Sequence, residues 1–268
     1  MLNLDQHSMV YAMKSVLVLL LLLLQTCLIG QDFQGKALYR FNNSYADEDW
    51  SKKKLSESET KMWKSKLSEA SRTTYDLRFN LNESSWAEVE SLNVQGDKKE
   101  AWWNEAKNGT LYKDLANLNY ELETEVFDKP FLVKDKLELP QWELRDETKQ
   151  IGSYQVQKAV LKIEKKVLAF GQEEPQIVFD EIVAWFCPQI PVAHGPKLFW
   201  GLPGLILEIQ EGSLTYICEK IELNSREEIR INRPKKGQEV SKKELDQIVE
   251  EKTEEILRKY NKGGKKGN

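Results

Sequence analysis

The side chains that could do chemistry are few in this sequence, and they form no familiar catalytic pattern. His194 is the only histidine apart from His7, and it stands in the stretch PVAHGPK between two prolines. A hydrolytic triad needs a nucleophile, a base and a group that orients the base. His194 could act as a lone base or ligand, but a single loop histidine is more typical of a residue that caps a turn through a hydrogen bond. We expect the second role.

Two acidic residues lie inside an apolar segment and could form a catalytic carboxylate pair. Asp180 and Glu181 interrupt IVFDEIVAWF, and paired carboxylates are the machinery of glycoside hydrolysis. Adjacent residues on a strand point to opposite faces, so only one of the two can face a core. We expect one outward acid and one that pairs with a lysine such as Lys158. An envelope hydrolase that uses these carboxylates stays open as an alternative.

Other classes of site lack their signatures. A zinc site needs three or four suitably spaced ligands, which the sequence does not offer. The phosphate-binding loop, the dinucleotide-binding glycine pattern and the nucleophile elbow of hydrolases are also missing. The formal net charge of −4 gives no basic face for nucleic acid. We therefore predict no metal, no cofactor and no nucleic-acid partner, and a protein that is not an enzyme.

Aromatic side chains are the remaining candidates for binding. The chain has eight tryptophans, and exposed tryptophans can line a glycan or lipid site. Trp185 and Trp200, together with His194, are the residues that we nominate for such a site. The alternative, which is the more usual role of tryptophan, is that these side chains belong to the core.

The first 30 residues have the anatomy of a secretory signal peptide. Lys14 precedes the apolar run SVLVLLLLLLQTCLIG, which is short for a membrane span and is followed by polar residues. We expect cleavage after Gly30, no transmembrane helix in the mature chain, and a location that is periplasmic, outer-membrane-associated or secreted. Met13 is a more natural start than Met1, and cleavage before Cys27 with lipidation is a second possibility for the leader.

Cys187 and Cys218 are the cysteines that remain after such a cleavage. Export places them in an oxidising compartment, where a disulfide is allowed. The two residues end the apolar segments IVAWFC and LTYIC. They could bridge if these segments form neighbouring strands, or they could be two buried thiols.

The elements that would position these residues are mostly strands. Clean alternation of apolar and polar residues predicts half-buried antiparallel strands at Tyr75–Leu81 and Tyr120–Val126. A further strand is expected in SYQVQKAVLKIE, and one buried on much of both faces in IVFDEIVAWFC. LILEIQ and LTYICEKIEL, joined by a turn at Gly212, predict a β-hairpin.

Two helices complete the pattern. The charged stretch DEDWSKKKLSESETKMWKSKLSEASR predicts one or two amphipathic helices. Ser241 followed by Glu244 is a capping box that begins a helix over 241–260, and we expect 261–268 to be disordered. The fold class is α+β, mainly β: one domain over 31–260, in which a single curved antiparallel sheet, like a half-barrel, packs against a helix from the N-terminal half and the C-terminal helix.

The stretch Gly201-Leu202-Pro203-Gly204-Leu205-Ile206 is interpreted as architecture. Pro203 fixes one backbone angle, and we expect a type II turn with Leu202 and Pro203 at its centre and Gly204 at a positive φ. Leu205 and Ile206 then begin a buried strand.

This hexapeptide belongs to a longer set of motifs that resembles the GLPGLI family. The other motifs are Trp142–Lys149, Ile151–Tyr154, Lys158-Ala159, Ala184-Trp185, Ile190-Pro191 and Gly195-Pro196. The family consists of exported envelope proteins of Gram-negative bacteria with unknown function, so the resemblance supplies no catalytic residue. It implies an exported envelope protein.

These observations favour a non-catalytic binding module whose ligand is an envelope protein or an apolar molecule held by the sheet. The hydrolase remains one alternative. A structural component of a surface assembly is another.

Overall fold

The computed structural model describes residues 33–47, 50, 55–71, 73–89, 109–167 and 176–263. Contacts divide the chain into two units, Met1–Phe33 and Gln34–Asn268, and all that follows concerns the second. The predicted signal peptide, Cys27 and the last five residues of the predicted tail lie outside the described residues.

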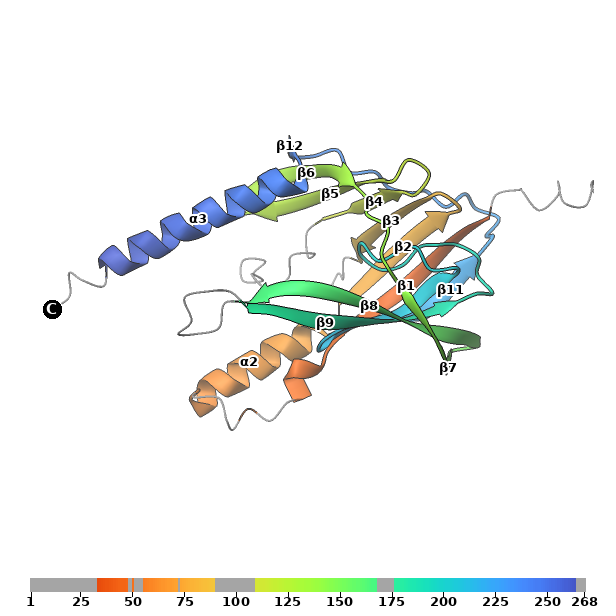
Figure 1. Ribbon diagram of the computed structural model, residues 1–268, viewed down its shortest axis with the longest axis horizontal. Helices are drawn as coiled ribbons and strands as arrows, with labels where there is room; N and C mark the ends of the chain where they lie inside the picture. Colours follow the sequence, from red (N-terminus) through yellow and green to blue (C-terminus); the bar gives the residue numbers. More distant parts are fainter. Residues whose placement is uncertain are drawn as a thin grey trace, which may run out of the picture. The chain divides into compact units, whose positions relative to one another are not determined.

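The second unit is built on one sheet of twelve strands (Figure 1). The spatial order is β12-β6-β5-β4-β3-β2-β1-β11-β10-β9-β8-β7, and every neighbouring pair is antiparallel except β12 with β6. The α+β, mainly β class is therefore confirmed. The strands are β1 (Gln34–Asn43), β2 (Thr74–Asn80), β3 (Glu83–Glu88), β4 (Leu111–Asp114), β5 (Asn119–Val126), β6 (Lys129–Lys136), β7 (Glu143–Ile151), β8 (Tyr154–Val167), β9 (Gln176–Cys187), β10 (Leu205–Glu211), β11 (Leu214–Leu223) and β12 (Gln238–Val240).

The predicted alternation places apolar side chains on one face of the sheet, here called the core face. On β2, Tyr75, Leu77 and Phe79 are buried and the residues between them are half-buried. Leu81, expected to continue this strand, lies in the turn after it and is exposed. Period-two alternation thus located the strand and its buried face, because successive side chains of a strand point to opposite sides.

Aromatic rings fill the middle of the core face. Trp86 on β3 stacks on Tyr75 with centroids 4.9 Å apart, and it meets Tyr39 and Tyr216 edge-on at 5.3 and 5.7 Å. These rings come from β1, β2, β3 and β11, which are neighbours in the sheet. The cluster therefore ties together strands from both ends of the sequence.

The predicted hairpin LILEIQ–LTYICEKIEL is confirmed as β10 and β11. Glu211 pairs with Leu214 across the turn, and Gly212 has a positive φ of 57°. The strand predicted in SYQVQKAVLKIE is confirmed as β8.

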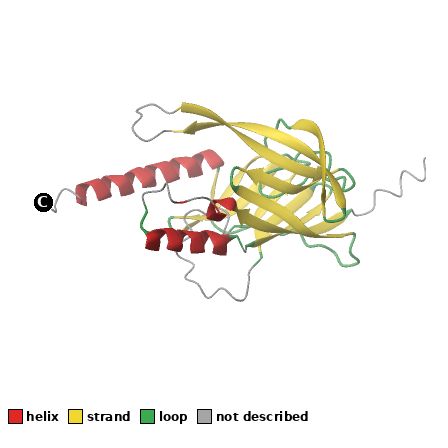
Figure 2. Ribbon diagram, turned by 90° about the horizontal axis from the view of Figure 1, so that it is seen from below, coloured by secondary structure: helices red, strands yellow, loops and turns green. Residues whose placement is uncertain are grey.

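Strand β9 departs from its prediction along its first half. We expected burial on much of both faces, but Ile177 is 55% and Phe179 70% exposed. The reason is topological, because β10 pairs with β9 only from Ile182 to Cys187, and β7 pairs with β8 only as far as Val160. Residues 162–167 and 176–181, called the distal hairpin below, therefore pair only with each other in the described part of the chain and extend past the neighbouring strands (Figures 1 and 2).

Strand β7 forms one edge of the sheet among the described residues. It is charged along most of its length, and its pairing with β8 is irregular between Leu144 and Thr148. Charges and bulges are the features by which natural sheets discourage pairing at an exposed edge.

Both helices begin at a capping box. α2 (Glu57–Ala70) follows Ser56, whose backbone N–H donates to the Glu59 carboxylate at 2.8 Å. α3 (Lys242–Gly263) follows Ser241, whose N–H donates to Glu244 at 2.7 Å. The predicted C-terminal helix and its cap are confirmed, with an end three residues beyond the expected one.

The helices meet the sheet at few strands. α2 contacts β1 and the short 3-10 helix η2 (Ser44–Asp47), and α3 contacts β6. Within the described residues, neither helix is long and apolar enough to cross a lipid bilayer.

Candidate functional site

The hexapeptide forms a tight turn whose geometry differs from the predicted one. The positive φ, 89°, is at Gly201, and Gly204 has none, so the predicted type II arrangement is wrong. Instead the N–H of Gly204 donates to the carbonyl of Leu202 at 2.8 Å, which makes a three-residue turn around Pro203. Gly204 is required for a different reason, since a Cβ there would lie 2.3 Å from the carbonyl oxygen of Cys187.

The segment between β9 and β10, residues 188–204, contains the first four residues of the hexapeptide and folds back over the core face; we call it the signature loop. Four of its apolar side chains, Ile190, Val192, Trp200 and Leu202, are buried, whereas Leu198 is exposed. Backbone hydrogen bonds join it to the start of β10, from Leu205 N–H to the Ile190 carbonyl at 2.9 Å and from Ile206 N–H to the His194 carbonyl at 3.0 Å. Trp200, nominated as a binding residue, is therefore a core residue.

A buried lysine of the core face donates hydrogen bonds to the signature loop. Lys113 on β4 is 0% exposed, and its ammonium donates to the carbonyls of Gly195 at 2.8 Å, Lys197 at 2.8 Å and Phe199 at 3.2 Å. Burial lowers the pKa of Lys113 to about 7. Three carbonyl acceptors match the three N–H donors of an ammonium group, so they favour its charged form.

His194 lies beside this lysine and is also fully buried. Its Nε2 atom is 3.1 Å from the carbonyl of Asn80, at the end of β2. Burial, with the nearby charge of Lys113, lowers the pKa of His194 to about 3. The expected hydrogen bond to a turn is present, but the side chain is in the core rather than in an open loop.

The topology brings together three residues of the kinds that serve as nucleophile or base in enzymes: Ser84, Lys113 and His194. Ser84 faces Lys113 across β3 and β4, an arrangement that could activate a serine. However, all three side chains are 0% exposed, and Lys113 already uses its three donors on backbone carbonyls. In this structure the three side chains are therefore closed to solvent.

Trp185, the third nominated binding residue, lies half-buried on the other face of the sheet. Lys149 on β7 places its ammonium 4.4 Å from the centre of the Trp185 ring, and Lys158 on β8 lies 5.9 Å from it. Each lysine also forms an ion pair. The Lys149 ammonium lies 2.7 Å from the Glu208 carboxylate, and the Lys158 ammonium lies 2.9 Å from the Glu147 carboxylate. The structure thus joins motifs that are far apart in sequence into one cross-strand cluster.

Asp180 and Glu181 do not form a facing pair. Both are exposed and lie at adjacent positions of the distal hairpin, where successive side chains point to opposite faces. The expected partner Lys158 binds Glu147 instead, and the cross-strand neighbour of Glu181 is Lys162. Among the residues described, no group of acids, histidines and cysteines is placed to hold a metal ion.

The proposed Cys187–Cys218 disulfide is absent, and both thiols are free and buried. Cys187 lies on β9 and Cys218 on β11, with β10 between them. Two inter-strand spacings are about 9.6 Å, whereas a disulfide needs Cα atoms less than about 7 Å apart. Burial raises the pKa of both thiols, that of Cys218 to about 12.

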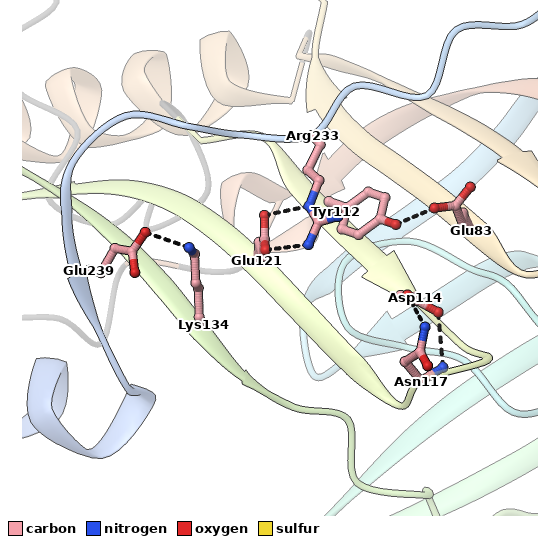
Figure 3. A network of polar contacts seen from close by, with 8 residues as sticks. All are labelled: Glu83, Tyr112, Asp114, Asn117, Glu121, Lys134, Arg233 and Glu239. Carbon is pink, nitrogen blue, oxygen red and sulfur yellow. Dashed lines mark hydrogen bonds and ion pairs between the residues drawn. The ribbon is translucent and has the colours of Figure 1, made fainter.

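A polar network lies on the outer face, opposite the core face, around Arg233 (Figure 3). The guanidinium donates to both carboxylate oxygens of Glu121 at 2.9 and 2.7 Å and lies 4.9 Å from the ring of Tyr112. The Tyr112 hydroxyl donates in turn to Glu83. The hydrogen bonds from Arg233 hold the pKa of the Glu121 carboxyl below its usual value, against the opposing effect of burial.

A shallow hollow of about 260 Å³ adjoins this network, bordered by Glu121, Leu132, Lys134, Arg233, Pro234, Lys235 and Glu239. Its charges are largely paired already, with Lys134 bound to Glu239 at 2.5 Å as well as Arg233 to Glu121. The network therefore fastens the segment before β12 to the sheet.

Sequence reasoning missed Lys113 and Arg233. Lys113 had one detectable signal, because it shares the inward face of β4 with Leu111, where an apolar residue is expected. Arg233 had none, since its partners Glu121 and Tyr112 are more than 100 residues away in sequence.

Residues 142–208 match a family model described as "Protein of unknown function (Porph_ging)". This stretch contains Trp142, Lys149, Lys158, Trp185 and the hexapeptide, so the chain is similar to a family of unknown function across these motifs. Membership of the GLPGLI family as such stays a prediction. No curated protein matches the sequence.

Two solved structures of PNGF-II, in the C2 and P21 space groups, are similar to the chain at 13% and 12% identity, with TM-scores of 0.48 and 0.47. The match covers 81% of this chain, which spans about a third of theirs, 32% and 33%.

Proposed function

We propose that this chain is an exported, non-catalytic envelope protein that binds a protein partner through its distal hairpin. The proposal of export is supported by the hydrophobic leader in residues 1–30. The observation that carries the binding proposal is the exposure of Phe179 and Ile177, at 70% and 55%.

These two side chains form an apolar strip on the distal hairpin. They are two residues apart on β9 and so point to the same side. An isolated two-stranded hairpin is only marginally stable in water. Because Phe179 and Ile177 are exposed, their side chains contribute no hydrophobic stabilisation to the fold. A partner that covers the strip, or adds a strand beside residues 176–181, would stabilise both features.

The core face gives less support to an apolar small ligand. The aromatic cluster and the signature loop pack against this face. Two hollows found among the described residues lie on the surface instead, one beside Arg233 and one on α3. The hydrolase alternative requires two carboxyl groups that face each other across a cleft. Asp180 and Glu181 do not meet that requirement.

Photo-crosslinking tests the proposal. A benzophenone amino acid in place of Phe179 should capture a defined envelope protein in the native cell. The matched control is the same amino acid in place of Phe127, which is 44% exposed in the turn between β5 and β6. Binding of the purified partner should then fall for F179S and I177S but not for F127S.

Equal crosslinking from both positions, or unchanged binding by F179S, would contradict the proposal. A lipid or glycan retained in native mass spectrometry would favour the small-ligand alternative. A partner that never dissociates during purification would favour the structural role in a surface assembly.

A further inference from the structure

The turn at Gly195–Phe199 directs three backbone carbonyls at a single point. They belong to alternate residues, 195, 197 and 199, and all three accept from the Lys113 ammonium. The N–H of Phe199 donates to the carbonyl of Pro196 at 3.0 Å, and Lys197 has a positive φ of 51°. The chain therefore curls tightly around the ammonium.

This arrangement has the chemistry of a cation site. Rings of backbone carbonyls replace the hydration shell of monovalent cations in proteins, and an ammonium group supplies three donors for three such carbonyls. No carboxylate of the described residues forms an ion pair with Lys113, so the carbonyl dipoles alone compensate the buried charge.

The environment of the Lys113 ammonium stabilises one positive charge but not a second one on His194. His194 lies close to Lys113, and the charge of the lysine contributes to the low pKa of the histidine. The buried His194 is therefore neutral at ordinary pH. The three carbonyls and the adjacent His194 are therefore associated with one positive charge, that of the Lys113 ammonium.

We propose that the carbonyls of Gly195, Lys197 and Phe199 form a binding site for a primary ammonium group, which Lys113 occupies as a tethered ligand, and that this occupancy holds the signature loop on the core face. Without the ammonium, one buried and two partly buried carbonyls would lose this hydrogen-bond partner, which would destabilise the loop in its present position. β4 and the loop, 82 to 86 residues apart in sequence, are thus joined through one charge.

Substitution of the lysine separates charge from packing. K113M keeps most of the length of the side chain and removes the charge, so backbone amides of residues 190–206 should exchange with deuterium roughly tenfold faster or more. The matched control is K134M, which removes an exposed lysine of β6, two strands away from β4 in the sheet, and should leave these amides unchanged.

Chemical rescue identifies the ligand class. K113A leaves space for a free alkylammonium ion, so n-propylammonium should slow the exchange of the loop amides, whereas tetramethylammonium at the same ionic strength should not, because it has no N–H donors. Equal rescue by both ions would show a general salt effect and overturn the proposal, as would a K113M protein with fully protected loop amides.

The unaltered protein provides a measurement that does not depend on how the variants fold. Lysine ¹⁵N NMR near pH 6 should show one ammonium nitrogen whose protons exchange slowly with water. A neutral amine at this position, or the absence of any slowly exchanging ammonium, would contradict the proposal.

Discussion

The hydroxyl of Tyr39 on β1 donates a hydrogen bond of 2.7 Å to the carbonyl of Ile206 on β10, although β11 lies between these strands. The carbonyl is available because the pairing of β10 with β9 shifts between Ile206 and Glu208. A residue from the first strand thus satisfies the backbone of the hexapeptide, 167 positions away.

Removal of this hydroxyl should destabilise the protein. Y39F leaves a buried carbonyl without a partner, and we expect the free energy of unfolding to fall by about 1–3 kcal/mol. Urea unfolding followed by tryptophan fluorescence measures the change. Y154F is the control, because the Tyr154 hydroxyl makes no hydrogen bond in the described part of the chain; equal stability of both variants would refute the role of Tyr39.

The two glycine requirements can be separated by alanine substitution. G204A places a Cβ 2.3 Å from the backbone of β9 without any change of φ sign, and overpacking against backbone costs about 1–3 kcal/mol or more. G212A has open space but a φ of 57°, which costs roughly 1–2 kcal/mol. We expect G204A to lower the urea midpoint more than G212A does; the reverse order would show that close approach is not what Gly204 serves.

His194 should make stability depend on pH. Its folded-state pKa, about 3, lies below the unfolded value of about 6.5, so the unfolded chain takes up a proton first as the pH falls. The contribution is complete above pH 6.5 and is lost progressively from there down to about pH 3. Between pH 7 and pH 5 the free energy of unfolding should fall by about 2 kcal/mol through this group alone.

The comparison with H194Q isolates that loss. Groups that titrate in both proteins cancel in the difference, so the wild type should lose stability more steeply than H194Q between pH 7 and pH 5. Parallel pH profiles from urea titrations would mean that the histidine becomes charged in the folded state.

The Glu121–Arg233 pair should be coupled despite its partly open position. Arg233 is 54% exposed, but Glu121 is only 10% exposed and the contact is bidentate. A double-mutant cycle of E121Q and R233M should give a coupling of about 1–2 kcal/mol, above the few tenths typical of exposed helical pairs. The pair Lys252–Glu255 on α3 is the reference, and equal coupling in both cycles would place the Arg233 network among ordinary surface pairs.

The sequence by itself determined the local elements of this protein. Alternating residues marked β2 and β5, the turn at Gly212 marked the hairpin of β10 and β11, and Ser241 with Glu244 marked the start of α3. These signals are local because they rest on the period of a strand, the φ of a turn residue or an orphan N–H at a helix end, all of which depend on residues within a few positions.

Only the tertiary structure decided which residues meet. Strand order separated Cys187 from Cys218 and left Phe179 beyond the part of β9 that pairs with β10. It also placed the loop residue His194 in the core. Lys113 and the signature loop became partners for the same reason. Such contacts depend on the pairing of strands far apart in sequence, and the pattern of one strand carries no information about the identity of its neighbours.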